Sequence, residues 1–92
     1  MNKEKTTNDP TIDGSSTING LSTLILHNDD NNSFDHVIDC LVMICDHNAQ
    51  QAEQCAMIVH NKGKCDVRSG EREAMLEMRR ALVERKLNAT VE

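Results

Sequence analysis

The chain has 92 residues and a mass of 10.3 kDa, which is enough for one small domain and too little for a multidomain enzyme. It carries 15 acidic and 10 basic residues, a formal net charge of −5, and Phe34 as its one aromatic residue. Nucleic acid and anionic membranes are therefore poor partners, because phosphate would repel the chain and base stacking needs aromatic rings. A cationic ligand or a basic partner protein fits the charge better.

The N-terminal segment, residues 1–20, is rich in Thr, Asn, Ser and Gly, with Ile12 and Ile18 as its sizeable apolar residues after Met1. It buries too little surface to offset the entropy lost on ordering, so we expect a flexible extension followed by one domain over residues 21–92. The N-terminus is polar, and no apolar run has the length of a signal-peptide core or a membrane span. We therefore expect a cytoplasmic protein.

The first apolar run, residues 21–26, is short and partly β-branched, which is typical of a strand. It is followed at residues 28–32 by five Asx residues, which favour turns and caps over strand pairing. From Phe34 to Cys45 apolar residues recur at spacings of three and four, which predicts a helix. Asn32 or Ser33 is its expected N-cap.

A second helix is indicated by Asn48 and Gln51, which have the spacing of a capping box, and by Gly63, which has the place of a left-handed C-terminal residue. Polar and apolar residues alternate over residues 64–69, which predicts a half-buried strand. The expected apolar face of the second helix consists of Ala52, Cys55, Ala56 and Val59.

A third helix is expected after Ser69 as its cap, with Arg85 and Lys86 in its last turn, where they would complement the helix dipole. Residues 87–91 alternate again and predict a closing strand. The order strand, helix, helix, strand, helix, strand predicts an α+β fold in which one layer of helices covers a small sheet. The expected core face of the third helix consists of Ala74, Met75, Met78, Ala81 and Leu82.

The four cysteines do not form a C-x-x-C pair, and three of them fall on apolar helix faces, where free cysteine acts as a small hydrophobic residue. We expect them to be reduced and structural, with no bound metal or cofactor. A metal or redox protein built on these cysteines and the histidines is an alternative that elemental analysis would test. They are Cys40, Cys45, Cys55 and Cys65.

Catalytic signatures are missing from the sequence: it has no nucleophile elbow, no glycine-rich phosphate loop and no histidine pair with metal-ligand spacing, so we do not expect an enzyme. Two features exceed what the fold requires. Residues 28–30, Asn-Asp-Asp, lie at a strand end, and His60 lies near a helix end. Each has an ordinary interpretation, as a helix cap and as a partner of the helix dipole.

If these two features converge in the fold, an amide oxygen, a carboxylate and a neutral imidazole nitrogen would provide acceptors for an ammonium group. Apolar side chains would lie beside them, which would let the pocket recognise a cation next to a hydrophobic group. The apolar residues expected there are Phe34, Val37, Val59 and Leu87.

These motifs, in this order and spacing, resemble the ClpS family, the bacterial adaptors of ATP-dependent Clp proteases. The resemblance runs from about Leu21 to the C-terminus. It implies a three-stranded antiparallel sheet covered by three helices, a shape related to the C-terminal domain of the ribosomal stalk protein. The matching segments are N-D-D at 28–30, F-D-H-V-I-D-C-L at 34–41, A-E-Q at 52–54 and V-H-N-K-G-K at 59–64.

The resemblance implies an adaptor that binds N-degrons, proteins whose first residue is bulky and hydrophobic, and delivers them to a Clp AAA+ unfoldase. The family's ligands of the α-amine match Asn28, Asp30 and His60, and Asp29 belongs to the same motif. Phe34 occupies a position where many members carry Met. The side-chain pocket of the family matches Asn32, Phe34, Val37, Ala56, Val59 and Leu87.

The expected partners are N-degron substrates and the N-terminal domain of a ClpA-like or ClpC-like unfoldase, with the adaptor as a monomer. Glu73 matches a position of the family's docking surface for the unfoldase, and Arg79 lies near the place where the family carries a lysine and is the other residue assigned to docking. The N-terminal extension matches the segment that serves delivery. The alternative is a small α/β protein-interaction domain without an amine pocket, in which the Asx residues only cap a helix.

Overall fold

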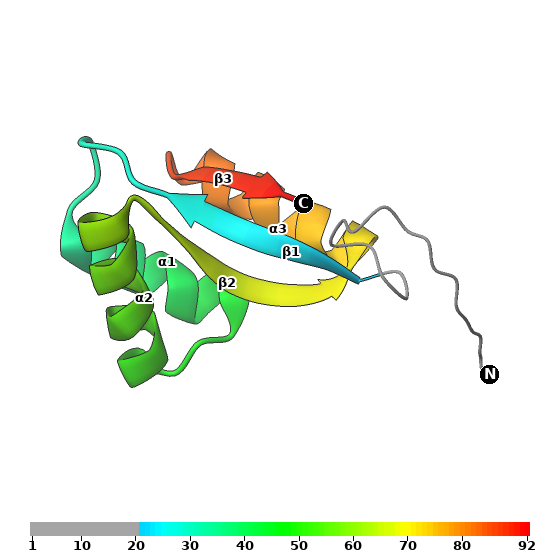
Figure 1. Ribbon diagram of the computed structural model, residues 1–92, viewed down its shortest axis with the longest axis horizontal. Coiled ribbons are helices and arrows are strands. Elements are labelled where there is room, and N and C mark those ends of the chain that lie inside the picture. The colour runs from blue at the N-terminus through cyan, green and yellow to red at the C-terminus, as the bar shows by residue number, and fades with distance from the viewer. Residues whose placement is uncertain (1–20) are drawn as a thin grey trace.

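The computed structural model describes residues 21–92. The flexible extension expected over residues 1–20 lies outside the described residues. The observed order of elements is the one that the sequence predicts, strand, helix, helix, strand, helix, strand (Figure 1). Their bounds are β1 Leu21–His27, α1 Phe34–Cys45, α2 Ala49–Lys62, β2 Lys64–Glu71, α3 Arg72–Glu84 and β3 Asn88–Val91.

The three strands form one antiparallel sheet in the order β2-β1-β3, so the first strand lies in the middle (Figure 1). In this register Leu26 of β1 lies between Cys65 of β2 and Ala89 of β3. The C-terminal end of β1 therefore meets the start of β2 and the start of β3. The predicted α+β fold with three helices against a three-stranded antiparallel sheet is confirmed.

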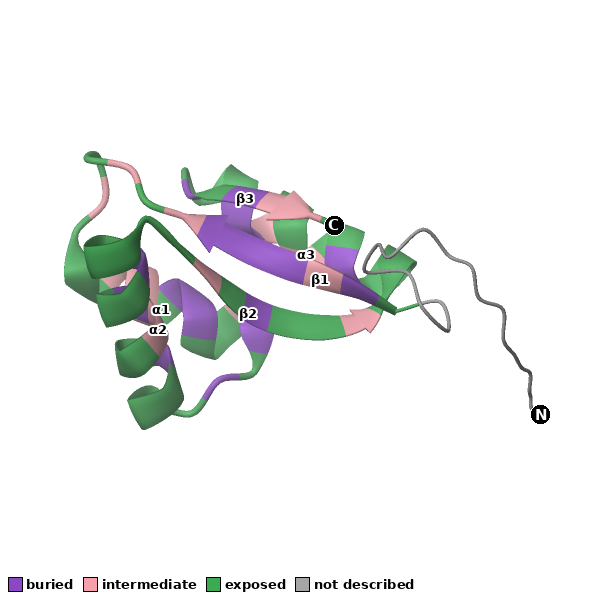
Figure 2. Ribbon diagram, in the orientation of Figure 1, coloured by how far each residue is buried: buried purple, intermediate pink, exposed green. Residues whose placement is uncertain are grey.

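One hydrophobic core joins residues from all six elements, and Figure 2 shows β1 as the most continuously buried strand. Three consecutive residues of β1, Leu24, Ile25 and Leu26, are buried. Phe34, which the apolar pattern of α1 includes, is an exception because 41% of its surface is exposed. The helix residues with the most complete burial are Cys40, Leu41, Cys45, Ala52, Met75 and Leu82.

Local capping signals fix the ends of the first two helices. The Ser33 side chain accepts a hydrogen bond from the backbone N–H of His36, which settles the choice of N-cap for α1. Asn48 and Gln51 form the predicted capping box of α2. Gly63 ends α2 with φ of 95°, a left-handed conformation that glycine adopts without a steric penalty.

The predicted start of the third helix was wrong. The strand β2 continues past Ser69 to Glu71 because residues 69–71 pair with residues 21–23 of β1. Glu71 is then the N-cap of α3 and makes no capping hydrogen bond through its side chain. Strand pairing to a distant segment thus overrides the local capping signal of Ser69.

The face and the end of α3 also differ from the prediction. Ala74 is exposed, because the buried face begins at Met75 and continues through Met78 to Leu82. The helix ends at Glu84, so Arg85 and Lys86 lie in the turn that follows it. Lys86 has a positive φ of 75° there, which reverses the chain toward β3.

None of the helices within residues 21–92 has both the length and the apolar character needed to cross a membrane.

Candidate functional site

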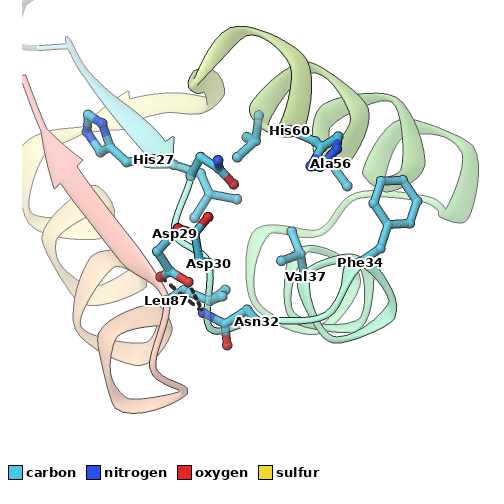
Figure 3. Close-up of a pocket in the computed structure, with 12 residues that line it drawn as sticks. His27, Asp29, Asp30, Asn32, Phe34, Val37, Ala56, His60 and Leu87 are labelled. Atoms are coloured by element: carbon cyan, nitrogen blue, oxygen red, sulfur yellow. Dashed lines mark hydrogen bonds between the residues drawn. The ribbon is translucent and has the colours of Figure 1, made fainter.

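A pocket of about 390 Å³ opens where the C-terminal end of β1 meets α1, α2 and the residue before β3 (Figure 3). All nine residues that the sequence analysis assigns to amine and side-chain binding line this one pocket. The structure adds three neighbours, Leu26, His27 and Asp29. The nine are Asn28, Asn32, Asp30, Phe34, Val37, Ala56, Val59, His60 and Leu87.

The ends of β1 and α2 are held together by backbone hydrogen bonds around Gly63. The N–H of Asn28 donates to the Gly63 carbonyl at 2.9 Å, and the N–H of Gly63 donates to the Val59 carbonyl at 2.9 Å. Because His60 lies in the last turn of α2, this junction brings Asn28 close to the helix turn that carries His60. Gly63, the left-handed residue that ends α2, therefore brings the Asx cluster and His60 together. Their convergence was only an assumption at the level of the sequence.

The loop between β1 and α1 contains a turn network, which consists of Asp29, Asn31, Asn32 and the carbonyl of Lys86. The Asp29 carboxylate accepts the backbone N–H of Asn31 at 3.0 Å and the side-chain N–H of Asn32 at 2.8 Å. The Asn32 amide also donates to the Lys86 carbonyl at 2.9 Å. The network fixes the loop to the turn before β3, and this places Leu87 at the pocket.

Asn32 therefore lines the pocket and also holds the loop, whereas the sequence predicted for it a place in the pocket or the role of N-cap of α1. Its side-chain N–H group faces Asp29, as the dashed lines in Figure 3 show. A second hydrogen bond holds the turn before β3: the His36 ring nitrogen Nε2 donates to the Arg85 carbonyl at 2.9 Å. The turn before β3 is thus attached to both the loop and α1.

Three polar side chains form an acceptor group at the mouth of the pocket: Asn28, Asp30 and His60. All three are exposed, and within residues 21–92 the Asp30 carboxylate makes no hydrogen bond or salt bridge. The C-terminal end of α2 adds the negative end of a helix dipole beside His60. This combination of a carboxylate, an amide, an imidazole and a helix C-terminus favours a bound cation.

The wall of the pocket is apolar. Val59 of α2 and Leu87 before β3 are 4% and 5% exposed and form its inner surface, and Val37 and Ala56 extend it along the helices. Phe34 lies at the rim, on the opposite side of Val37 from Asp30 (Figure 3). The pocket thus has a polar acceptor edge and an apolar edge with room between them for one large side chain.

Leu26 and His27 line the pocket but were not predicted to do so from the sequence. They are the last two residues of β1, directly before the Asx cluster, and this position was the available signal. The His27 ring contacts the Thr90 hydroxyl of β3 at 2.8 Å and points away from the pocket in Figure 3. It therefore contributes to the strand end rather than to the acceptor group.

The two residues assigned to unfoldase docking lie on α3, away from the acceptor group. Glu73 is exposed in the first turn of α3. The Arg79 guanidinium donates from Nε to the Ala89 carbonyl of β3 at 3.0 Å. It also lines a shallow hollow beside β3, which shares Asp29, Asn32 and Leu87 with the pocket. Arg79 thus attaches α3 to the last strand, a role that is distinct from the docking role expected for it.

The described part of the chain contains no group of three or more His, Cys, Asp or Glu side chains that could hold a metal ion. The four cysteines are free thiols in the structure, with Cys40 and Cys45 buried and Cys55 and Cys65 partly exposed. Burial raises the pKa of the Cys45 thiol to about 11. Such a protonated, enclosed thiol has the properties of a core residue rather than a nucleophile.

Comparison with known proteins places the chain among adaptors. Residues 20–90 match the family of the ATP-dependent Clp protease adaptor protein ClpS. The structure of Agrobacterium tumefaciens ClpS2 bound to L-phenylalaninamide is similar, with a TM-score of 0.70 and 23% sequence identity over 79% of this chain and 95% of the other. A search of curated proteins finds no match. Because the family match spans most of the 92 residues, the chain belongs to the ClpS family of Clp protease adaptors.

Proposed function

We propose that this protein binds N-degrons: it holds the free N-terminal residue of a client, when that residue is bulky and hydrophobic, and delivers the client to a Clp AAA+ unfoldase. The observation that carries the proposal is the position of the acceptor group beside an apolar wall in one pocket of a ClpS family member. The similar ClpS2 structure holds L-phenylalaninamide, a ligand with a free amine and a large apolar side chain.

The acceptor group suits a protonated α-amine. An ammonium has three N–H donors, and Asn28, Asp30 and His60 offer an amide oxygen, a carboxylate and a neutral ring nitrogen. The Asp30 carboxylate gives the strongest of the three contacts, because it alone adds an opposite charge to the hydrogen bond from the ammonium. Asp30 is therefore the residue on which amine recognition depends most.

The apolar wall would take the first side chain of the client. Complete burial of a Leu or Phe side chain contributes about 1.5–3 kcal/mol. Micromolar affinity corresponds to about 8 kcal/mol, so the contacts with the amine and with the first peptide groups must supply the remainder. Recognition of the client's first residue thus requires both the acceptor group and the apolar wall.

The same chemistry excludes hydrophobic residues inside a polypeptide. An internal Leu or Phe has no ammonium group, so its entry would desolvate the Asp30 carboxylate without giving it a donor. Leaving such a polar group unpaired costs about 1–3 kcal/mol, and more when it is charged. Only the start of a chain satisfies the acceptor group and the apolar wall together.

Delivery requires a surface that remains accessible while a client is bound. Glu73 lies at the start of α3, next to the pairing of Glu71 with Leu21, which is the opposite end of the sheet from the pocket. We propose that Glu73, with Arg79 further along α3, contacts the N-terminal domain of a ClpA-like or ClpC-like unfoldase. A monomer would then bind the client and the unfoldase at the same time.

The binding test compares fluorescent peptides that begin with Phe or Leu with copies whose amine is acetylated, measured by anisotropy. We expect at least tenfold weaker binding after acetylation, because acetylation removes the positive charge. Equal affinities would reject the amine site and favour the alternative, a protein-interaction domain without such a pocket. A peptide with Phe at its second position and Gly at its first serves as a control for nonspecific apolar binding.

A further inference from the structure

Two of the four cysteines lie side by side on different elements. Cys55 of α2 and Cys65 of β2 have their sulfur atoms 3.1 Å apart, and both residues are partly exposed. Cys40 and Cys45 of α1, by contrast, are 1% and 0% exposed. The partly exposed pair is therefore the one that a reagent in solution can reach.

We propose that Cys55 and Cys65 are an oxidisable dithiol, which closes to a disulfide between α2 and β2 on reaction with a small disulfide such as oxidised glutathione. A disulfide has its sulfur atoms about 2.05 Å apart, so the two sulfurs need to approach by only about 1 Å. No refolding of either element is required. This inference does not depend on the proposed function.

The reaction is a thiol–disulfide exchange in two steps. Burial, and then the hydrogen bond to Cys65, raise the pKa of the Cys55 thiol to about 12. One of the two protein sulfurs, as thiolate, attacks one sulfur of the small disulfide and releases a thiolate, which leaves a mixed disulfide on that cysteine. The other cysteine then loses its proton to solvent and attacks the protein sulfur of the mixed disulfide. The second small thiol leaves with that bond's electrons, so two protein thiols are oxidised and one small disulfide is reduced to two thiols.

Redox chemistry explains this pair better than a metal does. Zinc in a structural site takes four ligands, and in the described residues no third His, Cys, Asp or Glu joins the two sulfurs in a metal-binding group. The other two thiols, Cys40 and Cys45, are 1% and 0% exposed and cannot be reached from solvent. Two sulfurs in contact at a partly exposed position form a complete disulfide site and an incomplete metal site.

The disulfide would reinforce one wall of the pocket. Cys55 is followed directly by Ala56, which lines the pocket, and Cys65 pairs with Leu26, which also lines it. A bond between them would hold α2 against the sheet within a short loop that contains Gly63. Oxidation is therefore expected to stabilise the fold around the pocket and to leave the pocket open, since the two sulfurs already touch.

The test incubates the full chain with oxidised glutathione, then maps the disulfides by mass spectrometry and measures Tm with and without dithiothreitol. We expect loss of two of the four thiols, a single Cys55–Cys65 link, and a Tm that rises by about 5 °C or more and returns on reduction. The Cys55→Ser and Cys65→Ser variants should lose the link, and Cys40→Ala should keep it.

Three results would overturn the proposal: no link in the wild-type chain, a link that includes Cys40 or Cys45, or a Cys55–Cys65 link that leaves Tm unchanged. Because the wild-type chain is itself the main sample, the test does not rely on the folding of any variant. The Cys55→Ser variant should instead accumulate a stable glutathione adduct on Cys65, and an adduct confined to Cys40 or Cys45 would contradict the greater accessibility of the partly exposed pair.

Discussion

Asp29 and Asp30 are neighbours of the same residue type, yet they belong to two different regions of the pocket. The Asp29 carboxylate is occupied by the turn network, where it accepts from Asn31 and Asn32. The Asp30 carboxylate belongs to the acceptor group and has no such partner within residues 21–92. One carboxylate holds the loop in place, and the other is free to contact the proposed ligand.

The difference shows how a small protein separates stability from binding. A carboxylate that accepts several hydrogen bonds from its own loop contributes to folding and is no longer available to a ligand. An exposed carboxylate without a partner contributes little to folding because water solvates it equally well in both states. Substitutions at the two positions should therefore change different quantities.

The largest effect is expected for Asp30→Asn, which keeps the shape of the side chain and removes its charge. Binding of a peptide that begins with Phe should weaken at least tenfold, about 1.4 kcal/mol, since the charged contact with the amine is lost. The free energy of unfolding should stay within about 0.5 kcal/mol of wild type. Anisotropy and urea unfolding measure the two quantities, and unchanged binding would move the amine site away from Asp30.

Asp29→Ala should have the opposite profile. It removes the acceptor of the turn network, so the free energy of unfolding should fall by about 1–2 kcal/mol in urea titrations. Peptide affinity should fall less than in Asp30→Asn, because the loop is loosened and no ligand contact is removed. A variant that is as stable as wild type but fails to bind would erase the distinction between the two carboxylates.

Gly63→Ala tests the junction that brings Asn28 and His60 of the acceptor group together. No atom lies within 4 Å of the added methyl group, so the effect comes only from the left-handed backbone, and about 1 kcal/mol of stability should be lost. Gly63→Asn is the matched control, because Asn tolerates this conformation better and should lose less. Equal losses measured by thermal unfolding would show that the φ of 95° is not the cause.

The smallest effect is expected for Phe34→Met at the rim. The ratio of affinities for peptides that begin with Phe and with Leu should change two- to fivefold, below about 1 kcal/mol, because a flexible side chain replaces a rigid ring. Val42→Met is the control, since Val42 lies on the same helix with similar exposure, 39%, and outside the pocket. If the ratio changes equally in both variants, Phe34 does not determine which first residue of the client is preferred.

Local signals were enough to predict most of the fold. The capping box at Asn48 and the left-handed Gly63 act through residues within one helical turn, so they can be identified without knowledge of the rest of the chain. Ser69 carries a similar signal, but the pairing of residues 69–71 with β1 extends the strand and moves the start of α3. Long-range strand pairing is not visible in a local sequence pattern.

The site was predictable only in part for the same reason. The residue types in the acceptor group indicate an ammonium ligand, but their convergence depends on the backbone bond between Asn28 and Gly63. The second role of Asn32 depends on the Lys86 carbonyl, 54 residues away in the sequence. The kind of ligand could be inferred from the side chains in the sequence. Which of them hold the loop and which are free for a ligand could be seen only in the folded structure.

The proposed amine site is tested most directly by the energetic coupling between Asp30 and the α-amine of the client. Four affinities are measured by anisotropy: wild type and Asp30→Asn, each with a free and an acetylated peptide that begins with Phe. We predict that acetylation weakens binding at least tenfold in wild type and less than threefold in Asp30→Asn, because the two changes remove the same contact. Equal, additive losses in the two proteins would contradict a contact between Asp30 and the amine.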